Sequence, residues 1–358
     1  MSPRSSNCSA ITNPSFFRKG RVLASPQVRF PSNQGSPALF RSLSPCNPPG
    51  TIPEQPRLSD FCIKIAWEQG FVKQKLMKSK NHMYKIPVTG YDTLQYGNNV
   101  METLHSLLEQ ATKLQTIIHT KHPFDKNALI RLQKAYKNEI TWSSNALEGN
   151  TIHLAETQLI LEQGHTVHGH TVNEIRECIG HGRAYDYMFT QIHKQRIDEQ
   201  YIKELHYLFA KDIDTIPYPG EYRDVSKTFV TVTGSEYACP DYDEVPAKMT
   251  DLVDWTNTMR NTLHPIELAS QMHRRFVYIH PFPDGNGRIA RLLMNTVLLQ
   301  GQYMPVVIEP KQKEAYIQAL ENGRIYPTGF DIFIAQRELE QQRRFIKSLN
   351  IEIPENGM

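Results

Sequence analysis

Apolar residues recur at intervals of three and four positions over most of the chain after about residue 100, and this period predicts α-helices. One apolar stripe lies within residues 101–118 and a second within residues 129–142. Further helices are expected over about 154–163, 172–194, 198–211, from 244 onward, 265–280, 286–301, 311–322 and 328–348. The pattern therefore predicts an all-α helical bundle.

One segment breaks the helical period. Between Thr228 and Tyr237, β-branched residues alternate with other residues, and Gly234 and Ser235 provide a turn. This pattern predicts a short β-hairpin. Because a lone two-stranded hairpin is marginally stable in water, it must pack on the helices or act as a movable flap.

The first 53 residues differ in composition from the rest of the chain. They contain ten Ser and nine Pro, no Asp or Glu, and five Arg with one Lys. Removing these six basic residues from the total of 40 leaves 34 against 37 acidic residues, so residues 54–358 are mildly acidic. We expect a disordered tail over 1–53 and an ambiguous segment over 54–99. An acidic folded part argues against binding to nucleic acids.

Hydropathy and cysteine spacing restrict the compartment. No stretch reaches about 18 consecutive apolar residues, and no apolar signal core lies near the start, so we expect no membrane span and no secretion. The five cysteines are odd in number and lack the C-x-x-C spacing. We therefore expect a reducing, cytoplasmic compartment, with Cys178 and Cys239 as packing residues.

The residues that carry chemistry lie in His280-Pro-Phe-Pro-Asp-Gly-Asn-Gly-Arg-Ile-Ala-Arg291. Two glycines around Asn286 form a turn whose N–H groups can face an anion, and a helix begins directly after it. Arg288 and Arg291 are three positions apart, so they share one face of the first helical turn and can bind phosphates.

Two further residues of this segment complete the set. Asp284 beside a phosphate site would be repelled unless a cation lay between them, which indicates Mg²⁺. His280 precedes the turn and can accept a proton near neutral pH. A phosphate cradle, a metal ligand and a base together suit transfer onto a hydroxyl.

A dinucleotide-binding fingerprint is an alternative interpretation. Gly285, Gly287 and Ala290 fit G-x-G-x-x-A, and Glu309 follows at about the spacing of a ribose-binding acid. However, the first glycine does not directly follow a strand, and residues 265–279 show a helical stripe. The chain also lacks the alternating strands and helices of a parallel sheet. A glycine-rich helix start without function is a further alternative, but it leaves the phosphate-suited side chains unexplained.

The segment resembles the signature of the Fic (filamentation induced by cAMP) domain family, H-x-F-x-[DE]-G-N-G-R-x-x-R, at every defined position. The resemblance extends over about residues 100–345 and includes Gly220-Glu-Tyr-Arg223 and the predicted hairpin. It implies a protein adenylyltransferase that moves AMP from ATP to a Ser, Thr or Tyr hydroxyl of a protein. Removal of AMP, transfer of another phosphate-bearing group and a non-catalytic nucleotide-binding scaffold remain alternatives.

The resemblance also implies roles for individual residues. His280 would be the base, Asp284 would hold Mg²⁺, and Arg288 and Arg291 would bind the β- and γ-phosphates. The phosphates would be cradled by Gly285, Asn286 and Gly287. Weaker candidates for the nucleoside pocket are Tyr316 and Asn322. The flap that docks the target would include Thr228, Phe229, Val230, Thr231, Val232 and Thr233.

A second motif, Ser144-Asn-Ala-Leu-Glu148-Gly149, matches the inhibitory pattern [ST]-x-x-x-E-[GN] of the same family. In the family this glutamate pairs with the second arginine of the signature, here Arg291. The resemblance thus implies self-inhibition, with inhibitory helices over 100–170 and a catalytic core over 171–348. We also expect a homodimer and self-modification.

One remaining cluster is weaker. His165, His168 and His170 could suggest a metal site, but no Cys or carboxylate lies at ligand spacing. We interpret them as residues of a loop.

Overall fold

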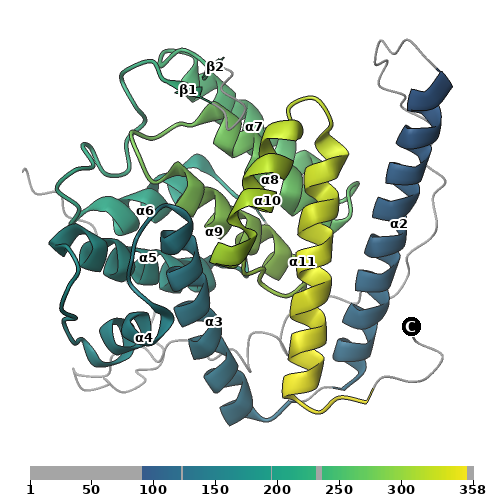
Figure 1. The fold of residues 1–358 in the computed structure, drawn as a ribbon, viewed down its shortest axis with the longest axis horizontal. Helices are drawn as coiled ribbons and strands as arrows, with labels where there is room; N and C mark the ends of the chain where they lie inside the picture. Colours follow the sequence, from purple (N-terminus) through teal and green to yellow (C-terminus); the bar gives the residue numbers. More distant parts are fainter. Residues whose placement is uncertain (1–90, 122–123, 195, 231–235, 353–358) are drawn as a thin grey trace, which may run out of the picture. The chain divides into compact units, whose positions relative to one another are not determined.

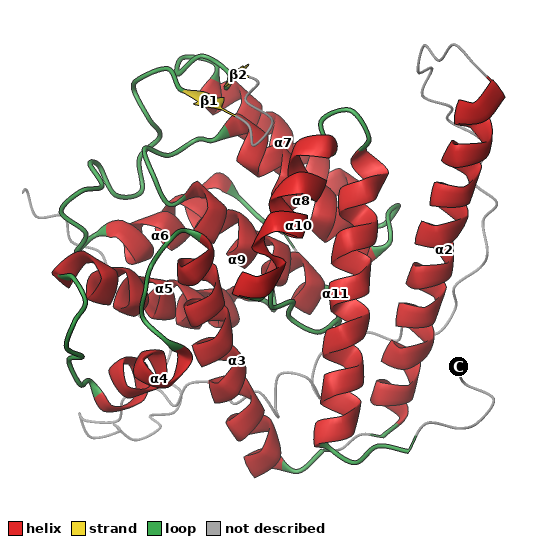
Figure 2. Ribbon diagram, in the orientation of Figure 1, coloured by secondary structure: helices red, strands yellow, loops and turns green. Residues whose placement is uncertain are grey.

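The computed structural model describes residues 91–121, 124–194, 196–230 and 236–352 (Figure 1). They form the predicted α-helical fold with one pair of short strands (Figure 2). The helices are α2 (Tyr91–Thr120), α3 (Lys126–Leu147), α4 (Leu154–Gln163), α5 (Val172–Gln191), α6 (Glu199–Ala210), α7 (Val245–Met259), α8 (Pro265–Ile279), α9 (Asn286–Gln300), α10 (Lys313–Asn322), preceded by the 3-10 turn η1 (Pro310–Gln312), and α11 (Pro327–Ser348). The tail predicted for 1–53 and residues 54–90 lie outside the described residues.

Local capping explains why the observed helix ends follow the predicted ones closely. At the start of α5, the Thr171 hydroxyl accepts the Glu174 N–H, and the Glu174 carboxylate accepts the Thr171 N–H. This reciprocal capping box satisfies donors that the helix itself leaves free. At its other end, α5 stops at Gln191, three residues before the predicted end at Lys194. The Lys194 N–H instead closes a tighter turn on the carbonyl of Gln191.

Helices α8 and α9 lie at the centre of the described fold. Every residue of α9 from Arg288 to Leu298 is buried, and α9 packs against α3, α5, α6 and α8. A helix surrounded on all sides has its first turn fixed by its neighbours. The loop 280–285, which joins α8 to α9, is therefore held in a rigid frame.

Helices α2 and α11 lie side by side and run in the same direction (Figure 1). Gln342 of α11 donates a hydrogen bond to the carbonyl of Ala111 in α2 at 3.0 Å. Helix α3 leaves this pair and carries its C-terminal end toward the start of α9. The segment Ser144-Asn-Ala-Leu-Glu-Gly149, which the sequence predicts to be inhibitory, is on that end.

The predicted hairpin is present in the described residues as strands β1 (Thr228–Val230) and β2 (Glu236–Ala238). The strands are antiparallel, with Phe229 opposite Tyr237. The proposed flap residues Thr231, Val232 and Thr233, and the turn at residues 234–235, lie outside the described residues.

Three other sequence predictions concern the described part of the chain. Cys178 and Cys239 are free and buried, as expected for packing residues, and burial raises the pKa of the Cys178 thiol to about 12. Residues 91–121, 124–194, 196–230 and 236–352 contain no group of three His, Cys, Asp or Glu placed to hold a metal ion. None of the helices in these ranges has both the length and the apolar character needed to cross a membrane.

Candidate active site

The turn before α9 depends on a glycine and on an asparagine side chain. Gly285 has φ of +80°, and a Cβ there would lie 2.8 Å from the Phe209 ring, so a side chain is excluded both by conformation and by space. The Asn286 amide accepts the Phe282 N–H at 2.9 Å and donates to the Phe282 carbonyl at 2.8 Å. The side chain of Asn286 thus shapes the loop, while backbone N–H groups of the turn start α9.

His206 of α6 packs against the same loop and bonds to it. Its ring stacks on Phe282 with centroids 3.9 Å apart. Nδ1 accepts the N–H of Gly220, so the proton is on Nε2, which donates to the Asp284 carbonyl at 3.0 Å. Burial lowers the pKa of His206 to about 4, so this ring is a neutral structural link between α6 and the loop.

His280 follows the last residue of α8 in the left-handed conformation, with φ of +51°. Its carbonyl accepts a hydrogen bond of 2.9 Å from Nε of the buried Arg223, which also donates to the carbonyls of Val225 and Pro240. The Phe229 ring of β1 lies 4.3 Å from the imidazole. Arg223 therefore joins the base of the hairpin to the loop that carries the candidate base.

The electrostatic surroundings keep the His280 imidazole neutral. Burial, followed by the positive charges of Lys227 and Arg223, lowers its pKa to about 3. Lys227 also donates to the carbonyl of Pro283. At neutral pH the ring therefore has a free lone pair and can accept a proton.

Asp284 and Arg288 lie on either side of the turn. One oxygen of Asp284 accepts the Gly285 N–H at 2.7 Å, the other is 3.5 Å from Arg288 Nη2, and the side chain is 62% exposed. Arg288 is buried, with its guanidinium 4.6 Å above the Phe209 ring and an ion pair of 2.9 Å to Glu177 of α5. Asp284 thus presents a carboxylate to solvent next to the buried guanidinium of Arg288.

Arg291 has each of its three nitrogens engaged. Nε donates to the Ser144 hydroxyl and Nη2 to the Ser144 carbonyl, both at 2.9 Å. Nη2 also bonds Glu148 Oε1 at 2.7 Å, and Nη1 donates to the Tyr316 hydroxyl at 3.3 Å. The end of α3 is therefore attached to α9 through one guanidinium.

The Glu148 carboxylate lies against the first turn of α9. A Cβ on Gly287 would come within 2.2 Å of Glu148 Oε1, so only glycine permits this approach. Burial opposes ionisation of Glu148, but the charges of Arg291 and Arg288 outweigh it and lower the pKa. Glu148 is thus an anion at the positively polarised start of a helix, where a phosphate would bind.

The structure brings most of the predicted residues together: Tyr316 reaches the site through its hydroxyl, which bonds Arg291, whereas no contact with the site is seen for Asn322 within the described residues. His280, Asp284, residues 285–287 and the two arginines surround the start of α9, with Ser144 and Glu148 opposite. Tyr316 is buried, with its ring against Phe330 and Phe333, while Asn322 is exposed at the end of α10. Their roles in nucleoside binding stay predictions.

Three residues of this site were missed by sequence reasoning as functional candidates. Arg223 lies in the segment Gly220-Glu-Tyr-Arg223, which offered a signal only through the family resemblance. His206 and Glu177 occupy ordinary helical positions with no local signal. Their importance depends on contacts with the 280–285 loop, for His206, and with α9, for Glu177, about 80 to 110 positions later in the chain.

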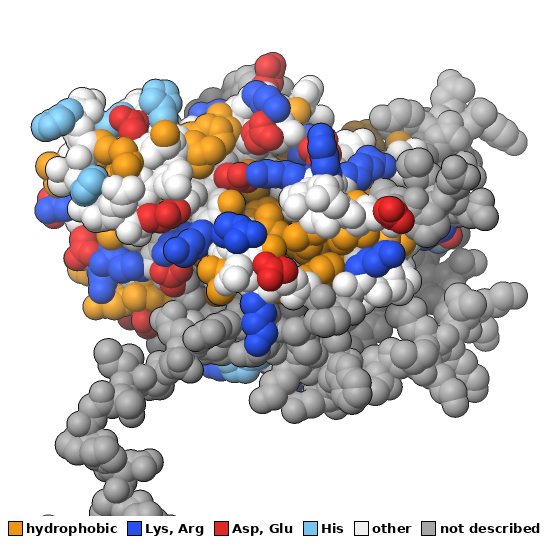
Figure 3. All heavy atoms as spheres, turned by 90° about the horizontal axis from the view of Figure 1, so that it is seen from below, with side chains coloured by type: hydrophobic (Ala, Val, Ile, Leu, Met, Phe, Trp, Pro, Cys, Tyr) orange, Lys and Arg blue, Asp and Glu red, His pale blue; other side chains and the backbone are white. Residues whose placement is uncertain are grey.

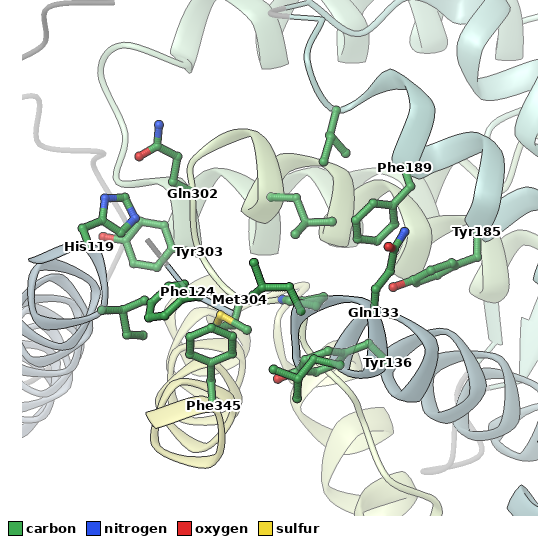
Figure 4. Close-up of a pocket in the computed structure, with 16 residues that line it drawn as sticks. His119, Phe124, Gln133, Tyr136, Tyr185, Phe189, Gln302, Tyr303, Met304 and Phe345 are labelled. Carbon is green, nitrogen blue, oxygen red and sulfur yellow. The ribbon is translucent and has the colours of Figure 1, made fainter. Parts of the chain in front are cut away.

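A separate apolar cavity of about 120 Å³ lies away from this site (Figure 4). It is lined by the end of α2, the start of α3, α5, the end of α11, and the end of α9 with residues 302–305, and its lining includes Phe124, Tyr136, Tyr185 and Phe345. Figure 3 views the molecule from below, and hydrophobic side chains gather on that face between Lys and Arg side chains. None of residues 280–291 lines this cavity.

Comparisons with known proteins agree with the geometry. The family model described as Fic/DOC family matches residues 196–298. Protein adenylyltransferase Fic of Drosophila grimshawi is 35% identical over 248 residues, which is 66% of this chain and 48% of that protein. The protein of the same name from Drosophila erecta is 37% identical over 218 residues, covering 59% of this chain and 42% of its own length. The chain thus spans about half the length of the curated relatives that it matches.

A solved structure extends the likeness to the fold. A Fic domain containing signaling protein from Bacteroides thetaiotaomicron superposes with a TM-score of 0.62 and 28% identity, over 70% of this chain and 99% of that one. Together with the signature at residues 280–291 and its arrangement around α9, these matches show that the chain carries a Fic/DOC family domain, which the family model places at residues 196–298.

Proposed function

We propose that this protein transfers AMP from ATP to a hydroxyl group of a protein and releases pyrophosphate. The observation that carries the proposal is the anion site at the start of α9, where Arg291 pairs with the carboxylate of Glu148 close beside Gly287. A neutral histidine and an exposed carboxylate adjoin this site. Relatives that match over about half their length are named protein adenylyltransferase, which supports the same activity.

His280 has the properties that a general base needs in this reaction. The imidazole accepts the proton of the target hydroxyl while its oxygen bonds to the α-phosphorus of ATP. The bond between that phosphorus and the bridging oxygen breaks, and pyrophosphate leaves with the electron pair. Because bound phosphates are negative, they raise the pKa of His280 from its low value and strengthen the base once ATP is present.

Arg288, Arg291 and the 285–287 turn are the proposed phosphate ligands. Guanidinium groups bind phosphate oxygens with charge-assisted hydrogen bonds, and the backbone N–H groups at the start of α9 add to them. We assign Arg288 to the β-phosphate and Arg291 to the γ-phosphate. Glu148 pairs with Arg291, so the enzyme is self-inhibited until this carboxylate moves.

Asp284 fits a Mg²⁺ ligand. Its carboxylate is exposed, accepts only one backbone hydrogen bond at close range, and lies beside the proposed phosphate site. Mg²⁺ in nucleotide sites takes one or two protein carboxylates and completes its shell with phosphate oxygens and water. A bound Mg²⁺ would supply neutralisation of the phosphate charge.

The β-hairpin is the proposed docking site for the target. Strand β1 lies over His280 through Phe229, so an extended peptide that pairs with this strand would bring its hydroxyl near the imidazole. A homodimer, self-modification and a cytoplasmic location stay predictions from the sequence.

Removal of AMP from a modified protein is a second candidate activity. The observation that favours it is the position of Glu148, which is ionised, 37% exposed on its side chain and held beside the phosphate site. Such a carboxylate can orient a water molecule toward a phosphodiester. A Glu148→Gly protein that keeps AMP removal would exclude this role.

Substitution of the base tests the proposed transfer. His280→Asn removes the imidazole but tolerates the left-handed backbone at this position. In a Glu148→Gly background we expect transfer of AMP from α-labelled ATP to fall at least about 100-fold while ATP affinity, measured by calorimetry, stays within about threefold. Transfer within about threefold of the parent would refute the assignment.

A further inference from the structure

Glu177 of α5 divides its two carboxylate oxygens between two partners. Oε1 pairs with Arg288 Nη1 at 2.9 Å, and Oε2 accepts a hydrogen bond of 2.8 Å from the Asn150 amide. The Glu177 side chain is 20% exposed and that of Arg288 only 4%. One carboxylate thus connects the first arginine of the 280–291 segment with a residue two positions after Glu148.

Asn150 in turn fixes the chain where α3 ends. Its N–H bonds the Asn145 carbonyl at 3.1 Å, and its amide donates both to Glu177 and to the carbonyl of Glu174. The side-chain oxygen Oδ1 of Asn150 accepts the Ile152 N–H at 3.0 Å. The turn that follows Glu148 is therefore fastened to α5 through the Asn150 side chain, and Thr151 adds two bonds from its N–H and hydroxyl to Glu174.

We propose that Glu177 is a positioning residue that orients Arg288 toward the phosphate site and links it, through Asn150, to the turn that holds Glu148. The assignment rests on the proposed function only in that Arg288 binds phosphate. Glu177 itself does not touch the reacting atoms.

The geometry gives a physical reason why Glu177 orients Arg288. Arg288 has one guanidinium nitrogen anchored on Glu177 and another directed at the exposed Asp284, 3.5 Å away. An arginine this deeply buried loses its solvation and needs a paired charge to keep one orientation. Glu177 supplies that charge on the inner side and leaves the outer nitrogen for a ligand.

The link between Arg288 and the turn that holds Glu148 follows from the carboxylate of Glu177, which both Arg288 and Asn150 contact. Any movement of Arg288 toward a phosphate changes its ion pair with Oε1 of Glu177, while Oε2 still accepts the hydrogen bond from Asn150. Because coupling between sites is reciprocal, loosening Asn150 must also change how readily ATP binds. Glu148 determines the direction of this change in ATP affinity. A looser turn releases the Glu148 carboxylate from Arg291, so that ATP binds more tightly.

The first experiment measures ATP affinity by calorimetry in the Glu148→Gly protein, so that inhibition does not mask the effect. We expect Glu177→Gln to weaken ATP binding at least about tenfold, and to weaken it no further when Arg288→Ala is present. Asp214→Asn is the matched control, because it breaks the pair between Asp214 and Arg176, the neighbour of Glu177 on α5. This control should leave ATP affinity and melting temperature unchanged.

The second experiment tests the link to the inhibitory turn. Asn150→Ala should raise ATP affinity at least about threefold when Glu148 is present and leave it unchanged in the Glu148→Gly protein. A purely structural role for Asn150 would change both backgrounds alike.

Two results would overturn the proposal: independent, additive losses from Glu177→Gln and Arg288→Ala, or an Asn150→Ala effect that does not depend on Glu148. The readout is binding, so it is separate from the test of function. Nucleotide binding that responds as described, without AMP transfer to any protein, would refute the proposed activity and keep the role of Glu177. Loss of ATP binding in the Glu148→Gly protein itself would overturn both.

Discussion

Replacing Glu148 by glycine should activate the protein. The substitution removes a carboxylate that bonds Arg291 Nη2 at 2.7 Å and lies against Gly287. Glu148 is the C-cap residue of α3, where its backbone N–H closes the last turn, and glycine is well tolerated at such a position. The change therefore removes the charge that we propose to be inhibitory, at little cost to the helix.

The contacts give the expected size of the effect. Hydrogen bonds that involve charged groups contribute about 1.5–3 kcal/mol when buried. Because 37% of the Glu148 side chain remains exposed, solvent screening lowers this to about 1–2 kcal/mol. At 1.36 kcal/mol for each factor of ten, we expect ATP affinity and self-modification to rise by about 5- to 30-fold.

Calorimetry with ATP and labelling with α-labelled ATP measure the two quantities. Glu148→Gly combined with Arg291→Ala should lose the gain, since the carboxylate acts through this guanidinium. Glu139→Ala is the matched control, because it removes another glutamate of α3 that pairs with an arginine, Arg344 of α11. Wild-type ATP affinity and self-modification in Glu148→Gly would refute the inhibitory role.

Two further predictions concern protonation. His280, with a pKa lowered to about 3, should show no protonation between pH 8 and pH 5.5 in an NMR titration of the free protein, and a midpoint near 6.5 would contradict its described surroundings. Asp331 is buried and hydrogen-bonded to Ser270, and burial raises its pKa to about 6. Its folded pKa exceeds the unfolded one, so its contribution to stability is lost as pH rises through about 6. Asp331→Asn should therefore raise the melting temperature more at pH 7.5 than at pH 5, and an equal change at both values would argue against this assignment.

The helices could be predicted from the sequence because their signals are local. The apolar period of α8 and α9, the prolines in the first turns of α7 and α8, and the capping box of α5 all act within a few residues. The turn before α9 was predictable for the same reason, since Gly285 supplies the positive φ that it requires.

The network around the arginines could not be predicted in the same way. Glu177 sits on an amphipathic helix where a glutamate is ordinary, and only the packing of α5 on α9 places it beside Arg288. Tyr316 shows the converse: its ring belongs to an aromatic cluster of the core, and its hydroxyl reaches both Arg291 and His273. Such contacts join elements from 25 to more than 100 residues apart, and no local pattern encodes them.

The pairing of Glu148 with Arg291 leaves one economical way to open the site. Arg291 projects from a buried helix and keeps bonds to both oxygens of Ser144 and to Tyr316, so moving it would break three contacts besides that with Glu148. Glu148 is partly exposed, lies at a helix end and is followed by Gly149 with φ of +101°. Rotation of the Glu148 side chain breaks one ion pair and leaves Ser144 in place, whereas a movement of the whole turn also breaks the bonds of Asn150 to α5. Inhibition should therefore be relieved by a local movement of residues 148–150, and a regulator would act most directly on the contacts of this turn with α5.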